Sequence, residues 1–380
     1  MGWKMQYRTF NKTGENVSLL GFGTMRLPKT KDGKIDEPEA IKMIRTAIDS
    51  GVNYVDTAYM YHDGESEVVT GKALKDGYRE KVLLADKMPI WFAKEEADVE
   101  KIFNKQFERL DVDCIDMYLL HSISKGAWKA IKKRNCIAFL EKQRAAGKIK
   151  HIGFSYHDDL EFFKEVIDAY PWEFCQIQLN YMDANFQAGV EGLKYAASKG
   201  VPVIIMEPLK GGKLTDVLPA SIETFWKQAD VKRAPAEWAL RWVADFPEVL
   251  TILSGVSSME QLEENTRILN DATPNSLTEK EHDIIEQVAD EYNKLIKYSC
   301  TACRYCMPCP QKIDIPSAIN SYNEWFLYDG NEKIKADFNT FTPVGKRPSN
   351  CIDCKACEGH CPQSLPISEI MVKAKEIFES

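Results

Sequence analysis

Several features common in other classes of protein are missing from this sequence. No run of about 18 apolar residues occurs, so no segment predicts a transmembrane helix. Residues 1–11 mix polar and aromatic side chains and contain no apolar core of the signal-peptide kind. Positive charge is not in excess, because 49 Lys and Arg stand against 57 Asp and Glu, giving a net charge of −8. These absences predict a cytoplasmic protein whose partner is neither a membrane nor nucleic acid.

The chain does contain enough apolar residues for a large core. It has 380 residues, of which 44% are hydrophobic and 28% charged, and a chain of this length can form more than one domain. Its eleven cysteines are unevenly distributed, because eight of them lie between Cys300 and Cys361. In a cytoplasmic protein, such a group indicates metal binding rather than disulfide bonds.

A unit of helix, glycine and apolar strand repeats along the first three-quarters of the chain. Asp56, Lys87, His121 and Ser155, each at the end of an apolar run, are separated by 31, 34 and 34 residues. This spacing fits one strand, one helix and two loops. We place eight strands at residues 17–24, 52–57, 81–87, 115–121, 149–155, 174–180, 201–206 and 249–254.

Eight such units predict an α/β protein with a (β/α)8 TIM barrel. The alternative is an open doubly wound sheet, but Gly21-Phe22-Gly23 lacks the third glycine of the phosphate-binding turn. The pattern of residues 5–24 predicts a short hairpin with Gly14 at its turn. Thr278 and Glu281 predict a capping box that starts a long helix. We therefore divide the chain into a barrel (1–275), a connecting helix (276–298) and a cysteine-rich domain (299–380).

Four ionisable residues follow the predicted barrel strands: Asp56, Tyr61, Lys87 and His121. Each alone would more often be a packed or solvated side chain, but the C-terminal ends of barrel strands meet at one face. A tyrosine has a pKa of about 10, and a neighbouring ammonium lowers it by favouring the phenolate. A carboxylate can hold the lysine, and a histidine can orient a carbonyl oxygen. The set is suited to donating a proton to a developing alkoxide.

These residues make the chain similar to the aldo-keto reductase superfamily over about residues 5 to 270. The resemblance implies NAD(P)H-dependent reduction of an aldehyde or ketone, a small carbonyl substrate, with Tyr61 as proton donor. It also implies that Ser155 and Gln176 hold the nicotinamide carboxamide, with Gln178 as the alternative to Gln176. The matching residues are Gly21-Phe22-Gly23-Thr24-Met25, Asp56-Thr57-Ala58 with Tyr61, Lys87, Leu120-His121, Ile152-Gly153-Phe154-Ser155, Gln176, Pro208-Leu209 and Glu264-Asn265.

The remaining dinucleotide contacts are expected on loops of the barrel. Residues 255–261 contain no cation for a 2′-phosphate, although amides at a helix N-terminus can bind phosphate, so NAD and NADP both stay open. The segment 210–213 could cradle a pyrophosphate or serve only as a loop hinge. Tyr156 and Met206 depart from the family pattern around the nicotinamide, which leaves a flavin as another cofactor. The expected contacts are Pro208, Leu209, Gly211, Gly255, Ser257, Gln261 and Asn265.

The eight clustered cysteines form two runs, each ending in Cys-Pro. The runs are Cys300-x2-Cys303-x2-Cys306-x2-Cys309-Pro310 and Cys351-x2-Cys354-x2-Cys357-x3-Cys361-Pro362. Zinc also binds paired CxxC motifs, but this double pattern resembles two-cluster ferredoxins, in which each fourth cysteine ligates the other cluster. The resemblance implies two 4Fe–4S clusters, one on Cys300, Cys303, Cys306 and Cys361 and the other on Cys351, Cys354, Cys357 and Cys309.

A helix predicted at 316–327, followed by a polar loop that contains Gly330 and Asn331, lies between the two cysteine runs and makes the domain similar to the α-helical ferredoxins. The order of a barrel followed by a ferredoxin-like domain resembles an aldo-keto reductase subgroup that carries such a domain at its C-terminus. Three functions fit: a carbonyl reductase with adjacent clusters, a ferredoxin-linked electron-transfer enzyme with a flavin or another redox substrate in the barrel, or a docking or regulatory module of an electron-transfer chain. We favour the first. Its substrate specificity is expected in loops 88–94, 122–130 and 211–233.

Overall fold

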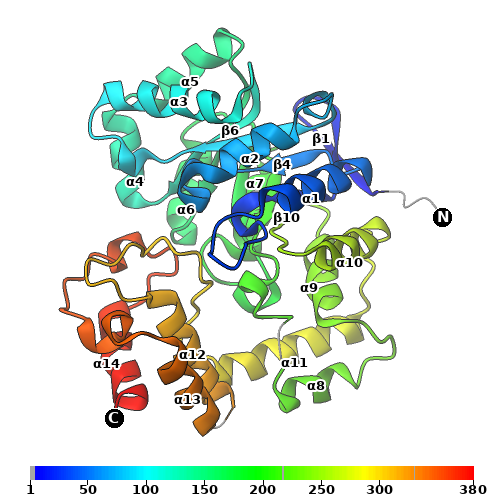
Figure 1. Ribbon diagram of the computed structural model, residues 1–380. Coiled ribbons are helices and arrows are strands. Elements are labelled where there is room, and N and C mark those ends of the chain that lie inside the picture. The colour runs from blue at the N-terminus through cyan, green and yellow to red at the C-terminus, as the bar shows by residue number, and fades with distance from the viewer. Residues whose placement is uncertain (1–4, 216–217, 329) are drawn as a thin grey trace. The chain divides into compact units, whose positions relative to one another are not determined.

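A computed structural model describes residues 5–215, 218–328 and 330–380 of the chain (Figure 1). The chain divides into two compact units. The first contains the residues up to Pro208 together with Ala236–Leu277, and the second contains Leu209–Pro235 and Thr278–Ser380. Across the described residues, no helix has both the length and the apolar character needed to cross a membrane.

The first unit is built on a closed barrel of eight parallel strands, which confirms the predicted fold. Asp56 pairs with Ala85 on the next strand, and Lys87 pairs with Leu119 on the strand after that. The strands, in barrel order, are β10 (Val249–Ser254), β3 (Leu20–Gly23), β4 (Tyr54–Asp56), β5 (Leu83–Met88), β6 (Ile115–Ile123), β7 (Ile149–Tyr156), β8 (Phe174–Gln178) and β9 (Val203–Met206).

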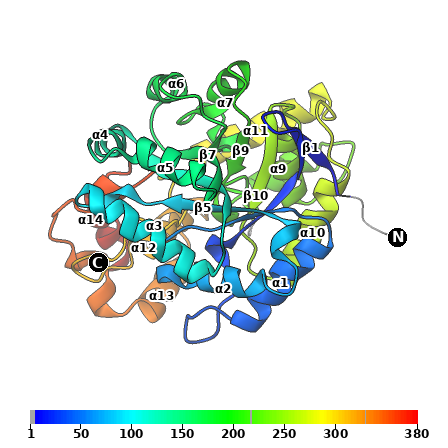
Figure 2. The ribbon, with the colours of Figure 1, turned by 90° about the horizontal axis from the view of Figure 1, so that it is seen from above.

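Helices lie outside these strands, as the view along the barrel in Figure 2 shows. Each buries one apolar face; α1, for example, is capped by the Asp36 carboxylate and buries Ala40, Met43, Ile44 and Ala47. Loop 122–130 was predicted, but its residues from Lys125 onward belong to α4. The helices are α1 (Glu37–Asp49), α2 (Glu65–Ala73), α3 (Glu96–Leu110), α4 (Lys125–Lys133), α5 (Cys136–Ala145), α6 (Leu160–Asp168), α7 (Gly189–Ser198), α9 (Pro235–Ala244) and α10 (Met259–Asn270).

An N-terminal hairpin of β1 (Tyr7–Phe10) and β2 (Glu15–Ser18) turns at Gly14, whose φ is +79°, as expected. The single strand predicted at 17–24 is wrong, because the strand is interrupted at Leu19, between β2 and β3. Ser18 and Asn53 exchange two hydrogen bonds at this break, of 2.7 and 2.9 Å. Phe10 and Val17 pack in one core cluster with side chains from the barrel strands.

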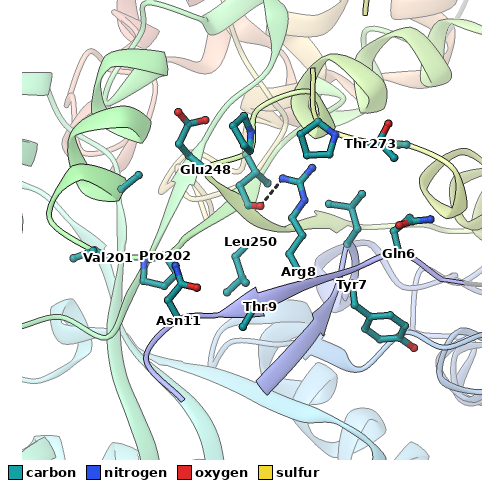
Figure 3. Close-up of a pocket in the computed structure, with 17 residues that line it drawn as sticks. Gln6, Tyr7, Arg8, Thr9, Asn11, Val201, Pro202, Glu248, Leu250 and Thr273 are labelled. Carbon is teal, nitrogen blue, oxygen red and sulfur yellow. Dashed lines mark hydrogen bonds between the residues drawn. The ribbon is translucent and has the colours of Figure 1, made fainter. Parts of the chain in front are cut away.

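A cavity of about 410 Å³ lies beside this hairpin and the start of β10 (Figure 3). Arg8 of β1 reaches across it and donates hydrogen bonds to the carbonyl oxygens of Ala244, Phe246 and Val249. Burial lowers the pKa of Arg8 to about 10. The arginine therefore ties the hairpin to the segment that enters β10.

The second unit is helical. The predicted capping box is present, because Thr278 and Glu281 begin α11 (Glu279–Leu295) with reciprocal hydrogen bonds. The insertion predicted at 211–233 contains α8 (Ala220–Trp226), although residues 216 and 217 lie outside the described part. An ion pair between Arg233 and Glu281 holds this insertion against α11.

The cysteine-rich part of this unit contains α12 (Ile315–Leu327), the predicted helix, and ends with α14 (Ile367–Phe378). The polar loop predicted around Gly330 and Asn331 is shorter than expected, because α13 (Glu332–Phe341) begins directly after Asn331. Asn331 caps α13, and Phe338 anchors it by stacking on Phe378 at 4.6 Å. This helix is more polar than α12 and buries only Phe338, which is why the sequence did not reveal it.

Candidate active site and cysteine clusters

The ends of β4 and β5 bring a lysine into contact with an aspartate and a tyrosine. Lys87 Nζ lies 2.5 Å from Asp56 Oδ1, 2.7 Å from the Thr57 carbonyl oxygen and 3.4 Å from the Tyr61 hydroxyl oxygen. Lys87 is 1% exposed and Asp56 is 3% exposed. Burial and two short contacts therefore fix the ammonium beside the phenol.

The loop that carries Tyr61 has an unusual backbone. It forms the 3-10 turn η2 (Tyr61–Gly64), in which His62, Asp63 and Gly64 have φ values of 50°, 57° and 92°. Three successive left-handed residues are uncommon because a side chain disfavours this region. Contacts from outside the loop are needed to hold such a conformation.

His121 of β6 lies beside this pair. Its ring centroid is 6.3 Å from that of Tyr61 and 5.1 Å from that of Trp91, which belongs to the short turn η4 (Ile90–Phe92). Burial, and then the charges of Lys87 and His157, lower the pKa of His121 well below its ordinary value. The imidazole is therefore neutral near pH 7 and has one N–H to donate.

The residues expected at the nicotinamide already have protein partners. Gln176 Nε2 donates to Asp56 Oδ2 at 3.1 Å, and Ser155 Oγ accepts from the Ser122 amide at 2.7 Å. Ser155 and Gln176 are neighbours in the register of β7 and β8. Gln178 instead donates to Asp183 at 2.7 Å. Of the two glutamines, Gln176 is therefore the one that contacts Asp56.

The expected phosphate-binding segment forms the start of α10. The side chain of Ser258 caps this helix, and Gln261 Oε1 accepts from the Ser257 amide at 2.9 Å. Asn265 Nδ2 donates to Ser254 at 2.8 Å, which fixes the helix to the end of β10. Pro208 lies just after β9, whereas Leu209 and Gly211 belong to the second unit.

Arg26 supplies a cation near this segment that the sequence analysis missed. It ends the turn η1 (Thr24–Arg26) after β3, and a Cβ placed on Gly255 would lie 3.5 Å from its side chain. The two positions are far apart in sequence, so only the pairing of β3 with β10 brings them together.

A buried polar group behind the catalytic set was also missed. Glu67 of α2, Asp86 of β5 and Gln106 of α3 are each 0% exposed. Gln106 Nε2 donates to the Lys87 carbonyl oxygen at 3.0 Å, and Arg109 of the same helix donates to the Tyr59 carbonyl oxygen at 3.0 Å. A glutamine on the otherwise apolar face of α3 was the available sign in the sequence.

In the second unit, the fourth cysteine of the second run joins three cysteines of the first. Cys300, Cys303, Cys306 and Cys361 line one small cavity, whose other walls include Ile319, Leu365 and Ile367. Burial and the neighbouring Cys300 and Cys361 raise the pKa of the Cys306 thiol to about 12. An apolar cavity with four thiols suits a cluster that needs four thiolates.

The other four cysteines are more accessible. Burial, and then the charges of Glu358, Cys309 and Cys351, raise the pKa of the Cys357 thiol to about 11, which places Cys309 near the second run. Cys354 is exposed. Among the described residues, no group of three or more His, Cys, Asp and Glu side chains is arranged to hold a single metal ion.

Comparison with known proteins finds two families along the chain. Residues 19–290 match the model of the aldo/keto reductase family, and residues 299–365 match that of the 4Fe-4S dicluster domain. The chain is 30% identical to L-galactose dehydrogenase of Arabidopsis thaliana over 287 residues, which cover 69% of this chain and 87% of the relative. It is 26% identical to NADH-specific methylglyoxal reductase of Escherichia coli over 307 residues, which cover 68% and 91%.

Solved structures of aldo-keto reductases also match this chain. An aldo-keto reductase from Bacillus halodurans in its holo form matches with a TM-score of 0.63 at 26% identity, over 75% of this chain and 96% of the other. An aldo-keto reductase from Klebsiella pneumoniae in complex with NADPH matches with a TM-score of 0.60 at 25% identity, over 75% and 95%. The chain therefore belongs to the aldo/keto reductase family and carries a C-terminal 4Fe-4S dicluster domain.

Proposed function

We propose that this protein reduces an aldehyde or ketone to an alcohol, with Tyr61 as the proton donor. The observation that carries the proposal is the buried Lys87, held 2.5 Å from Asp56 and 3.4 Å from the Tyr61 hydroxyl oxygen. As a carbonyl is reduced, negative charge develops on its oxygen. A tyrosine beside an ammonium can give up its proton to that oxygen, because the ammonium stabilises the phenolate left behind.

His121 has the complementary role of orienting the carbonyl. Its lowered pKa keeps the imidazole neutral, so it donates a hydrogen bond without becoming a competing acid. Trp91, in contact with His121, forms an apolar wall for the substrate. Together these residues define a small carbonyl compound as the substrate class.

A nicotinamide dinucleotide is the proposed cofactor, and when bound it supplies the hydride. Ser155 and Gln176 would hold its carboxamide, and the amides at the start of α10 would bind phosphate. The aliphatic part of the Arg26 side chain lies beside Gly255, and an arginine can pair with a 2′-phosphate, so NADPH is proposed alongside NADH. The names of the matched proteins support both dinucleotides, since one is NADH-specific and another was solved with NADPH.

The second unit is proposed to hold two 4Fe–4S clusters. Cys300, Cys303, Cys306 and Cys361 would ligate the cluster in the apolar cavity. Cys351, Cys354, Cys357 and Cys309 would ligate the other. Because Cys354 is exposed, electron exchange with a ferredoxin or another electron-transfer protein is a second candidate function.

The test is a Tyr61→Phe variant assayed with NADPH and NADH on a panel of aldehydes and ketones. We expect kcat to fall about 10²–10⁴-fold with little change in thermal stability. Tyr78→Phe is the control, because Tyr78 also loses a hydroxyl bonded to a charged partner, Asp49, at the surface. Unchanged reduction by Tyr61→Phe would rule out the proton-donor role.

A further inference from the structure

Helix α3 contacts both halves of the proposed catalytic set from behind the barrel wall. Gln106 and Arg109 are three residues apart and lie on the same side of this helix. One reaches the strand end that carries Lys87, and the other reaches the loop that carries Tyr61. A single rigid element thus links the two groups whose separation governs proton donation.

The Lys87 backbone is held from both sides. Its carbonyl oxygen accepts from Gln106 Nε2 at 3.0 Å, and its amide donates to Asp86 Oδ1 at 2.8 Å. Tyr118 of β6 donates to the other end of the Gln106 amide, which fixes the orientation of that side chain. All of these side chains are 0% exposed, so no water competes for the bonds.

The Tyr61 loop is held by Arg109. Its guanidinium donates to the Tyr59 carbonyl oxygen at 3.0 Å and lies 4.4 Å from the centroid of the Tyr59 ring. A Cβ on Gly64 would lie 2.5 Å from Arg109 Cζ, so the loop closes directly against the guanidinium. Glu67 of α2 pairs with Arg109 at 2.6 Å and keeps it in place. The left-handed turn is therefore fixed on both sides of Tyr61.

We infer that Gln106 and Arg109 are positioning residues that set the distance between the Lys87 ammonium and the Tyr61 hydroxyl, with Glu67 and Asp86 as their supports. The inference rests on the proposed role of Tyr61 as proton donor. A small displacement is expected to have a large effect, because a misplacement of about 1 Å at an active site can lower the rate about 10²-fold. The ammonium also acts on the phenol through a Coulomb interaction that weakens with distance.

Arg109→Ala should lower kcat about 10–100-fold and change KM for the carbonyl less than about threefold, because no substrate contact is removed. Arg109→Lys should recover part of the rate, since it retains the charge next to Glu67. The matched control is Arg45→Ala. Arg45 makes the same kinds of contact away from the site, donating to the Ala73 carbonyl at 3.0 Å, pairing with Asp76 at 2.8 Å and lying 4.7 Å from the Tyr78 ring.

The pH profile separates positioning from stability. Moving Lys87 away from Tyr61 would raise the pKa of the phenol, so the basic limb of the reduction rate should shift to higher pH in Arg109→Ala. The charged and titratable groups around this pair are Asp56, His121, Glu67, Asp86 and Arg109 itself. Because Arg109→Ala also removes a charge, the neutral replacement Gln106→Leu isolates the effect of position on this limb. Arg45→Ala should lose thermal stability without a shift in this limb.

Gln106→Leu tests the contact of α3 with the Lys87 backbone. The result does not depend on whether Arg109→Ala folds. It should also lower kcat and shift the same limb, because the Lys87 carbonyl loses its donor. If Gln106→Leu and Arg109→Ala both kept the wild-type kcat and pH profile, the positioning role would be wrong. That result is distinct from failure of the proposed function, which would appear as activity retained by Tyr61→Phe.

Discussion

The two candidate sites of this protein are organised in different ways. In the barrel, the chain itself fixes the reactive groups: Lys87 contacts Asp56, Thr57 and Tyr61, and a closed sheet surrounds them. In the second unit, the cysteines lie on loops between helices, and burial raises the thiol pKa of Cys306 to about 12. The barrel site is preorganised by protein contacts, whereas the cysteine sites need a cationic cluster to favour their thiolates.

The largest effect should come from removing iron. Chelation, or Cys306→Ser, should unfold much of the cysteine-rich part, because the cluster contributes folding free energy there. The barrel should remain folded and keep its carbonyl reduction. Iron content should drop from about eight per chain toward about four in Cys306→Ser. Visible absorption, circular dichroism and the reductase assay measure the three outcomes. Unfolding of the barrel together with loss of the clusters would contradict the view that protein contacts alone hold the barrel site.

A large effect within the barrel is expected from Lys87→Met. It leaves Asp56 as a buried unpaired charge, so the free energy of unfolding should fall by about 3–5 kcal/mol. Reduction should fall at least about 100-fold. The double variant Lys87→Met/Asp56→Asn should regain most of the stability but none of the activity. Denaturant unfolding and the reductase assay together test this, and recovery of activity in the double variant would contradict it.

A smaller effect is expected at the other end of the barrel, from Arg8→Met. It removes hydrogen bonds to the carbonyl oxygens of Ala244, Phe246 and Val249, at a cost of about 2 kcal/mol. Because none of these groups is near Tyr61 in the fold, kcat and KM should stay at wild-type values. A change in kcat larger than the change in folded fraction would show that the two ends of the barrel are coupled.

The smallest effect is expected from Asp86→Asn. Burial and the neighbouring Glu67 raise the pKa of Asp86 well above its ordinary 3.8. The folded state therefore binds this proton more tightly than the unfolded state does, and the stabilisation present below pH 3.8 is lost as the pH rises through the raised pKa. An asparagine at this position cannot titrate, so the stability of Asp86→Asn should fall less than that of the wild type as the pH rises from about 5 to about 9. Melting temperatures measured at the two pH values test this. If they change by the same amount in the wild type and the variant, the prediction is wrong.

The sequence predicted the barrel because each strand is an apolar run that ends in a polar or charged residue such as Asp56 or Lys87. It did not predict the interruption of the strand at Leu19, where the neighbouring Ser18 forms hydrogen bonds with Asn53 in a distant segment of the chain. It missed α13 because that helix buries little more than Phe338.

The same limit applies to the site. Lys87 and Tyr61 could be found from spacing, and the structure places them together. Gln106, Arg109 and Arg26 could not, because on the chain they are ordinary residues of a helix and a turn. Their contacts with Lys87, Tyr59 and Gly255 exist only after the elements have packed. The sequence thus reveals groups that do chemistry more readily than groups that hold them.

The left-handed turn after Tyr61 has a consequence for protein engineering. Gly64 has no room for a side chain against Arg109, so a library that varied residues 61–64 would consist mostly of inactive or misfolded clones. The turn that carries Trp91 and Phe92 lacks this restriction, and Phe92 is 51% exposed. Efforts to redirect the enzyme to new carbonyl compounds would best be concentrated there.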